Sequence, residues 1–249
     1  MNAPPPQQFF LDAQLDLARA IQGADLASVR ALAPRVELNT PGAHDMTLLA
    51  FAMMAASDLD APHLAVLTEL VRLGADPHQE IPHIGTVWGA SLNAAAPLYT
   101  KALLDGGVDP NYKLKGHTPS LFRASSEVTV ETMRLLIERG ADVNARDTVG
   151  TPAITFVLRT MQLDQVDELL DRGADPTAVN LLGQSFLFVL NGLIERAQPG
   201  SEALAKMESI RNRVLATGRL KWPPDSPRTE RELLREQGVE PIVPVGESR

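Results

Sequence analysis

The sequence contains no cysteine, and this absence removes several kinds of chemistry at once. Structural disulfides, thiolate nucleophiles and cysteine-ligated zinc sites each need a thiol, so all three are excluded. The stability and the function of this chain must therefore depend on other side chains.

Aromatic residues, long apolar runs and positive charge are also scarce. Aromatics make up 4% of the 249 residues, while hydrophobic residues make up 44%, so the core must be mainly aliphatic, which favours helices. The longest apolar run, residues 48–56, is too short to cross a bilayer. The formal charge of -8 disfavours a nucleic-acid partner, whose phosphates it would repel, and suits a neutral or basic protein.

The beginning of the chain, MNAPPPQQFF, lacks the basic and apolar regions of a secretory signal. Its proline cluster predicts a disordered lead over residues 1–11. We therefore expect a cytoplasmic chain that does not associate with membranes, and the Ala- and Arg-rich composition points to a bacterial source.

A short phrase occurs four times at a constant interval. The phrases are RLGADPH, DGGVDPN, ERGADVN and DRGADPT, and their glycines, Gly74, Gly107, Gly140 and Gly173, lie 33 residues apart. A period of about 20–50 residues indicates stacked supersecondary units. Each glycine is predicted to end a helix in the left-handed conformation, and the Asp two residues later is predicted to bond the turn backbone.

Each unit also contains a second helix start. Thr118 and Thr151, in GHTPSL and GTPAI, are predicted N-caps, and the proline after each would occupy the first helical position. Comparable starts are expected near Thr47, Pro62, Pro97 and Ser185. The predicted unit is a helix, a loop, a second helix and a long turn.

The period of 33, the sequence Gly-Ala-Asp-Val-Asn at 140–144 and the Thr-Pro helix starts resemble ankyrin repeats over residues 12–218. The resemblance implies an all-α ankyrin-repeat solenoid of about six helix-turn-helix units with long β-hairpin-like loops. Residues 219–249 are expected to form a C-terminal cap helix, ending at Gly238, and a loose tail. That helix would cover the last hydrophobic face of the array.

Catalytic motifs are largely missing from this chain. Neither GxGxxG nor GxxxxGK[ST] occurs, and GASLN at 89–93 lacks the closing glycine of a nucleophile elbow. We expect no enzymatic activity, no cofactor and no metal. The rival hypothesis is a metal-dependent or enzymatic site on the loop 78–83, which carries His78, Glu80 and His83.

The resemblance implies that the protein binds another protein through a concave groove formed by loop tips and first helices. Carried over to this sequence, the expected partner-binding residues are Tyr112, Lys113, Lys115, Arg146, Thr148 and Leu181 in loops and Ser125 and Arg159 on first helices. The divergent loop HQEIPHIGTVW adds Ile81 and Trp88. Two questions stay open: Tyr112 either contacts the partner or packs on the adjacent loop, and Phe186 and Phe188 line either a pocket or the core.

The expected partner is another protein, and a sharper hypothesis concerns its kind. Small stand-alone bacterial ankyrin proteins resemble immunity or antitoxin proteins, and the acidic charge of this chain would suit a basic toxin or effector. The free chain is expected to be monomeric, with a self-associating structural scaffold as the alternative.

Overall fold

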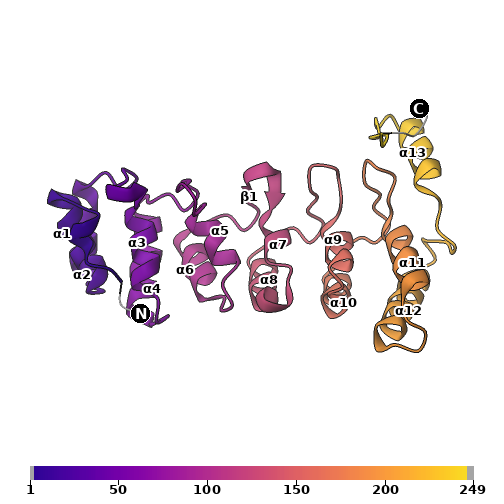
Figure 1. Ribbon diagram of the computed structural model, residues 1–249, viewed down its shortest axis with the longest axis horizontal. Helices are drawn as coiled ribbons and strands as arrows, with labels where there is room; N and C mark the ends of the chain where they lie inside the picture. Colours follow the sequence, from indigo (N-terminus) through magenta and orange to yellow (C-terminus); the bar gives the residue numbers. More distant parts are fainter. Residues whose placement is uncertain (1–2, 246–249) are drawn as a thin grey trace. The chain divides into compact units, whose positions relative to one another are not determined.

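The computed structural model describes residues 3–245 as short helices joined by turns and hairpin loops (Figure 1). The chain divides into two compact units. Unit 1 comprises the chain up to Tyr112 together with Glu131–Arg139, and unit 2 comprises Lys113–Val130 and the chain from Gly140 onward. No helix of the described residues is long and apolar enough to cross a membrane.

Unit 1 contains three complete helix pairs. They are α1 (Asp12–Gln22) with α2 (Leu26–Leu32), α3 (Leu48–Ala55) with α4 (Ala61–Arg72), and α5 (Val87–Leu92) with α6 (Leu98–Gly106). Short 3-10 turns cover Pro6–Gln8, Ala33–Arg35 and Ala43–Asp45. First helices pack on first helices and second helices on second helices, α1 and α5 on α3, and α2 and α6 on α4. The fully buried side chains of unit 1 include those of Phe10, Phe51, Trp88, Leu67, Leu70 and Leu103.

Unit 2 continues the same pattern and adds hairpins. Its helices are α7 (Ser120–Arg123), α9 (Ala153–Arg159) with α10 (Leu163–Asp171), α11 (Phe186–Arg196) with α12 (Glu202–Leu215), and α13 (Pro227–Glu236). Strand β1 (Lys113–Leu114) pairs antiparallel with β2 (Thr118–Pro119), and 3-10 turns cover Lys115–His117 and Glu127–Thr129. Helix α8 (Val130–Glu138) follows α7 in the chain but belongs to unit 1 from Glu131 onward. The described residues thus contain six helix pairs and a further C-terminal helix, which confirms the predicted architecture.

The four repeated turns have the predicted geometry. Gly74, Gly107, Gly140 and Gly173 have φ angles of 102°, 110°, 91° and 89°, a region that residues with a Cβ rarely adopt. In each turn the Asp that follows accepts a hydrogen bond from the backbone N–H two residues later, at 2.8 to 3.0 Å. The Gly-x-Asp phrase therefore ends one helix and shapes the loop after it.

Two asparagines connect successive turns. In unit 1, Asn39 accepts a hydrogen bond from the Asp76 N–H at 2.8 Å and donates to the Gly74 carbonyl at 3.0 Å. In unit 2, Asn144 makes the equivalent bonds with Asp175 at 2.8 Å and Gly173 at 3.5 Å. One side chain in each case holds its own turn in register with the next, because a side-chain amide can both donate and accept.

The predicted N-caps are wrong at Thr118 and Thr151. Helices α7 and α9 begin after Pro119 and Pro152, and no side chain caps either of them. Both prolines pair across a hairpin, so the extended backbone continues one residue further than expected. The caps predicted at Thr47 and Ser185 are confirmed, with side chains that accept from the Ala50 and Phe188 N–H groups.

The segment before α1 is ordered, which corrects the expectation of a disordered lead over residues 1–11. Phe10 is fully buried, and its ring lies edge-on to Phe51 with centroids 5.5 Å apart. The Phe9 carbonyl accepts a hydrogen bond from the Ala43 N–H at 2.7 Å, and a Cβ at Gly42 would collide with that carbonyl. Burial of a Phe side chain stabilises by about 1.5–3 kcal/mol, which helps to hold a short segment in place. Residues 1–2 lie outside the described range.

The C-terminal helix forms where it was predicted but packs elsewhere. Ser226 caps α13 by accepting from the Thr229 N–H at 3.2 Å, and Gly238 follows its end with φ 78°. The buried Arg231 donates to the Leu182 carbonyl at 2.9 Å, and the Ile242 N–H donates to the Leu181 carbonyl at 2.7 Å. Helix α13 and the segment after it therefore cover the loop 177–184 rather than the last helix pair, as the expected cap would have done (Figure 1).

Candidate binding surface

Three loops of unit 2 fold back as hairpins, which we call fingers. The first finger (113–119) contains β1 and β2, and the second (146–152) and third (179–185) are closed by single bridges between Arg146 and Pro152 and between Val179 and Ser185. Among the residues expected to bind a partner, four are exposed on the first two fingers: Lys113, Lys115, Arg146 and Thr148.

A hollow of about 660 Å³ lies beside the third finger, along the first helix α11 and against Arg159 at the end of α9. Its walls include the half-buried apolar side chains of Phe188, Val189 and Leu193 and the exposed guanidinium groups of Arg159 and Arg196. Arg159 donates a short hydrogen bond to the Gln184 side chain, which joins the end of α9 to the third finger. The structure thus brings Arg159 together with apolar groups and a second arginine.

Two of the expected contact residues also connect neighbouring fingers. The Arg146 guanidinium donates to the carbonyls of Gly150 and Val179 at 3.3 and 3.2 Å. The half-buried Leu181 donates its N–H to the Val149 carbonyl at 2.8 Å. A substitution at Arg146 would therefore disturb the second and third fingers as well as any contact with a partner.

Three of the expected contact residues are buried, so their predicted role at the surface is wrong. Ser125 turns inward and donates to the Leu121 carbonyl at 2.6 Å, because α7 ends early and its following turn packs against the core. Trp88 is the largest fully buried side chain and belongs to the core around α5. Ile81 is buried where its backbone pairs with Gly85.

Tyr112 packs on the preceding loop of unit 1. Its ring stacks on His78 with centroids 3.4 Å apart and an angle of 12°, and its side chain is half-buried. Of the two alternatives for this residue, the structure favours packing. Burial lowers the pKa of His78 below its ordinary value, although the nearby charges of Asp76 and Asp109 act in the opposite direction.

The metal hypothesis for the loop 78–83 loses its geometric basis. Within residues 3–245, no three histidine, aspartate or glutamate side chains are grouped so that they could hold a metal ion. His78 stacks on Tyr112, whereas Glu80 and His83 are exposed. A site with such dispersed groups would not fix ligand geometry.

The sequence left Phe186 and Phe188 open between a pocket and the core and did not indicate Gln184 or Arg196. Phe186 is fully buried, as core packing predicts, but Phe188 lines the hollow. A signal for this was present, because residues two apart on a helix point to nearly opposite sides, so Phe186 and Phe188 cannot share one core-facing stripe. Gln184 and Arg196 carry no comparable pattern.

The charge of this surface is opposite to that of the whole chain. The charged side chains of the three fingers and the hollow are those of Lys113, Lys115, Arg146, Arg159 and Arg196, against Asp147 and Glu195. The Asp147 carboxylate accepts hydrogen bonds from the N–H groups of Val149 and Thr151 at 3.0 and 2.8 Å, so its charge stabilises the backbone of the second finger. The surface is therefore basic, although the chain carries a formal charge of -8.

Comparison with known proteins supports the fold and nothing finer. No protein family and no curated protein matches the sequence. Among solved structures, the chain is similar to the ankyrin repeat domain of Bcl-3, a member of the IkappaB protein family, with a TM-score of 0.62 and 24% sequence identity over 88% of this chain and 97% of that one. Together with the six helix pairs and their repeated turns, this similarity shows that the chain has the ankyrin-repeat fold.

Proposed function

We propose that this protein binds a partner protein through the fingers and the hollow of unit 2 and catalyses no reaction. Ankyrin-repeat folds are generally protein–protein interaction modules. The observation that carries the proposal is the hollow itself, whose lining combines Phe188, Val189 and Leu193 with Arg159 and Arg196. Aromatic and arginine side chains around an apolar centre are the groups enriched at protein interfaces.

The basic character of this surface favours a partner that presents an acidic patch beside an apolar side chain. Complementary charge increases the rate of association and selects among partners. The expectation of a basic toxin or effector is harder to support at this surface, because the lysines and arginines of the fingers would repel it. An immunity role would therefore involve a toxin whose contact region is acidic.

The remaining expectations are part of the same proposal. We infer that the protein acts in the cytoplasm as a monomer, without a cofactor, and that neither nucleic acid nor a membrane is its partner. The self-associating scaffold is the alternative, and sedimentation velocity over a hundredfold range of concentration would distinguish a constant monomer from a growing oligomer.

The test uses Arg196→Glu, which reverses the charge of a side chain that lines the hollow. Arg196 is preferable to Arg146 and Arg159, because those two side chains also bond to the fingers. The matched control is Arg228→Glu, on the exposed side of α13, where the guanidinium makes a long contact to Glu232 at 3.4 Å.

Tagged wild-type protein is used to capture a partner from a native lysate, and the affinity of the purified partner is then measured by calorimetry. We expect Arg196→Glu to weaken binding at least about tenfold, equivalent to 1.4 kcal/mol, and Arg228→Glu to leave it within about twofold. Equal binding by wild type and Arg196→Glu would show that the partner uses another surface.

A further inference from the structure

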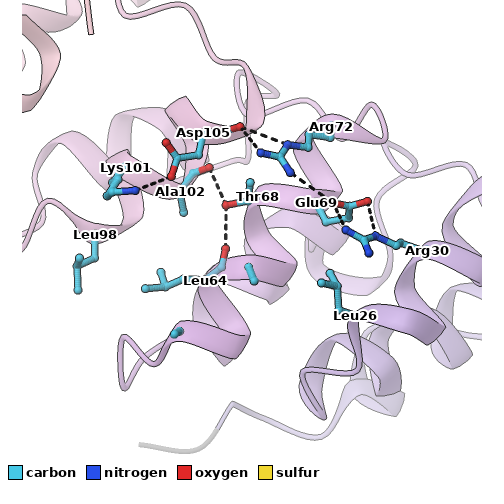
Figure 2. Close-up of a pocket in the computed structure, with 12 residues that line it drawn as sticks. Leu26, Arg30, Leu64, Thr68, Glu69, Arg72, Leu98, Lys101, Ala102 and Asp105 are labelled. Atoms are coloured by element: carbon cyan, nitrogen blue, oxygen red, sulfur yellow. Dashed lines mark hydrogen bonds and ion pairs between the residues drawn. The ribbon is translucent and has the colours of Figure 1, made fainter. Parts of the chain in front are cut away.

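Unit 1 has a groove of its own, formed by second helices. Helices α2, α4 and α6 line a groove of about 510 Å³ that shares no residue with the fingers or the hollow (Figure 2). Its two sides differ in chemistry. One side carries Leu26, Leu64 and Leu98, and the other carries a series of charged side chains, as Figure 2 shows.

The charged side is a chain of ion pairs and hydrogen bonds that joins one helix to the next. Arg30 of α2 binds Glu69 of α4 through two contacts, at 2.8 and 3.2 Å. Arg72 of α4 donates to the Asp105 carbonyl of α6 at 2.9 Å. The Asp105 carboxylate accepts from Lys101 at 2.6 Å. This ladder orders the cationic heads along the groove before anything binds there.

The carboxylates of the ladder are turned inward and the cations outward. The side chains of Glu69 and Asp105 are 12% and 32% exposed, whereas those of Arg30, Arg72 and Lys101 are each more than half exposed. Asp105 also pairs with Arg139, at 2.7 Å, so four cations surround two acids. The groove therefore presents an excess of positive charge in an acidic protein.

The apolar side provides shape and contact area. Leu98 lies in the first turn of α6 with 37% of its surface exposed, and Leu26 and Leu64 are half-buried. Between them Ala61 and Ala65 of α4 are exposed and small, so the middle of the groove remains open. A row of aliphatic side chains opposite a row of cations would not suit nucleic acid, which offers phosphate along its whole length.

We propose that this groove binds an amphipathic helix of a partner protein, one that carries an acidic stripe next to an apolar stripe. Helices that dock in grooves present an apolar stripe built from positions such as i, i+3 or i+4, and i+7, and that stripe would run along the side that carries the three leucines. Glu or Asp side chains on the adjacent stripe would reach the outward guanidinium and ammonium groups. This site goes beyond the function proposed for unit 2, because it uses different helices and a different kind of contact.

The probe is a fluorescein-labelled peptide of about 18 residues, roughly five helical turns, with leucines on one stripe and glutamates on the next. Its twin has lysine in place of every glutamate. Fluorescence anisotropy is measured as the full chain is titrated into each peptide. We expect saturable binding of the acidic peptide, weaker binding as salt is raised, and at least about tenfold weaker binding of the lysine twin.

The variant that tests the site is Leu98→Glu. An acidic residue in the first turn of a helix is favourable, so α6 should keep its structure, which circular dichroism will verify. We expect at least a tenfold loss of affinity for the acidic peptide. Leu233→Glu on α13, where the leucine is 40% exposed, is the matched control and should change the affinity by less than about twofold. Ala65→Glu, in the middle of the groove, is the second variant if Leu98→Glu does not fold.

Several outcomes would overturn the proposal. They are the absence of saturable binding up to about 1 mM, the weak end of specific association, equal binding of the lysine twin, and unchanged affinity in both groove variants. Self-association that Leu98→Glu abolishes would assign the groove to a second copy of the chain. Arg196→Glu should leave peptide binding unchanged, so failure of this site and failure of the unit 2 surface are distinguishable.

Discussion

Within each unit, ion pairs join neighbouring second helices. The two sets of ion pairs are similar, but they leave opposite charges facing the solvent. In unit 1 the acids Glu69 and Asp105 lie inside and the cations outside. In unit 2, Lys206 binds Asp164 and Asp167, at 2.9 and 2.7 Å, and Arg213 binds Asp167 and Asp171, at 3.2 and 2.6 Å. There Asp164 and Asp171 are 96% and 68% exposed, while both cations are less than half exposed.

This difference shows that one repeat architecture sets where charges meet but not which sign remains outside. Arg72 and Asp105 are one repeat apart, 33 residues, and so occupy equivalent positions in the last turns of the neighbouring helices α4 and α6. A net charge of -8 therefore says little about a particular surface, because the acids concentrate on some helices and leave others basic. The groove of unit 1 and the fingers of unit 2 are both basic regions of an acidic protein.

The ends of the two units also differ in how they are held. In unit 1, the buried ring of Phe10 holds the segment before α1 by apolar packing. In unit 2, hydrogen bonds from Arg231 and Ile242 to the third finger hold α13 and the segment after it. The expected effects of breaking them differ accordingly.

The largest expected effect is that of Phe10→Ala. Removing a fully buried ring leaves a cavity beside Phe51, and such truncations cost about 3–5 kcal/mol of unfolding free energy. Urea unfolding of the full chain measures this loss. Leu11→Ala is the control, because Leu11 is adjacent and largely exposed, and its loss should stay below about 0.5 kcal/mol. Similar losses for the two variants would contradict the packing of Phe10.

Arg231→Ala should have the next largest effect, and a more local one. The Leu182 carbonyl loses a charged donor, which typically costs about 1.5–3 kcal/mol. Hydrogen exchange should accelerate at the Ile242 amide, which bonds to Leu181, and remain slow in α9. Arg228→Ala, on the exposed side of α13, serves as the control. Unchanged exchange at Ile242 would mean that Arg231 does not hold α13 on the finger.

A direct comparison of the two ladders comes from Glu69→Gln and Asp171→Asn. Glu69 is mostly enclosed and makes a two-contact pair with Arg30, so we expect a loss of about 1 kcal/mol. Asp171 is largely exposed, so its loss should be less than about 0.5 kcal/mol. Chemical unfolding of both variants in the same buffer checks the difference. Equal losses would remove the distinction between inward and outward carboxylates.

The smallest expected effect is a pH dependence of unit 1. Hydrogen bonds from Arg30 lower the pKa of Glu69 below its ordinary value, and those from Lys101 and Arg139 lower the pKa of Asp105 although burial acts to raise it. Groups with depressed pKa values stabilise the fold above their unfolded pKa values, and this contribution is lost as the pH falls through the folded ones. Unfolding free energy should therefore decline from about pH 5 downward. The decline should be shallower in Glu69→Gln, and an identical slope would contradict the pKa shift of Glu69.

Much of the fold was predictable because its determinants are local in the sequence. A glycine at a left-handed position and an aspartate two residues later act within one turn. The recurrence of this phrase every 33 residues was therefore enough to predict the helix pairs. The candidate surface was only partly predictable. Lys113, Lys115, Thr148 and Arg159 are exposed as expected, but Ser125, Trp88 and Ile81 are buried, because burial depends on neighbours from other repeats.

The sequence by itself determined the repeat, its turns and the start of the C-terminal helix, since these depend on backbone conformation and on contacts within a few residues. Only the tertiary structure decided that Phe10 enters a core, that α13 lies on the third finger, and that inward carboxylates leave cations on the groove of unit 1. These outcomes join side chains that are distant in the chain. Their free energy depends on which surfaces meet, and that is not encoded in any single stretch of residues.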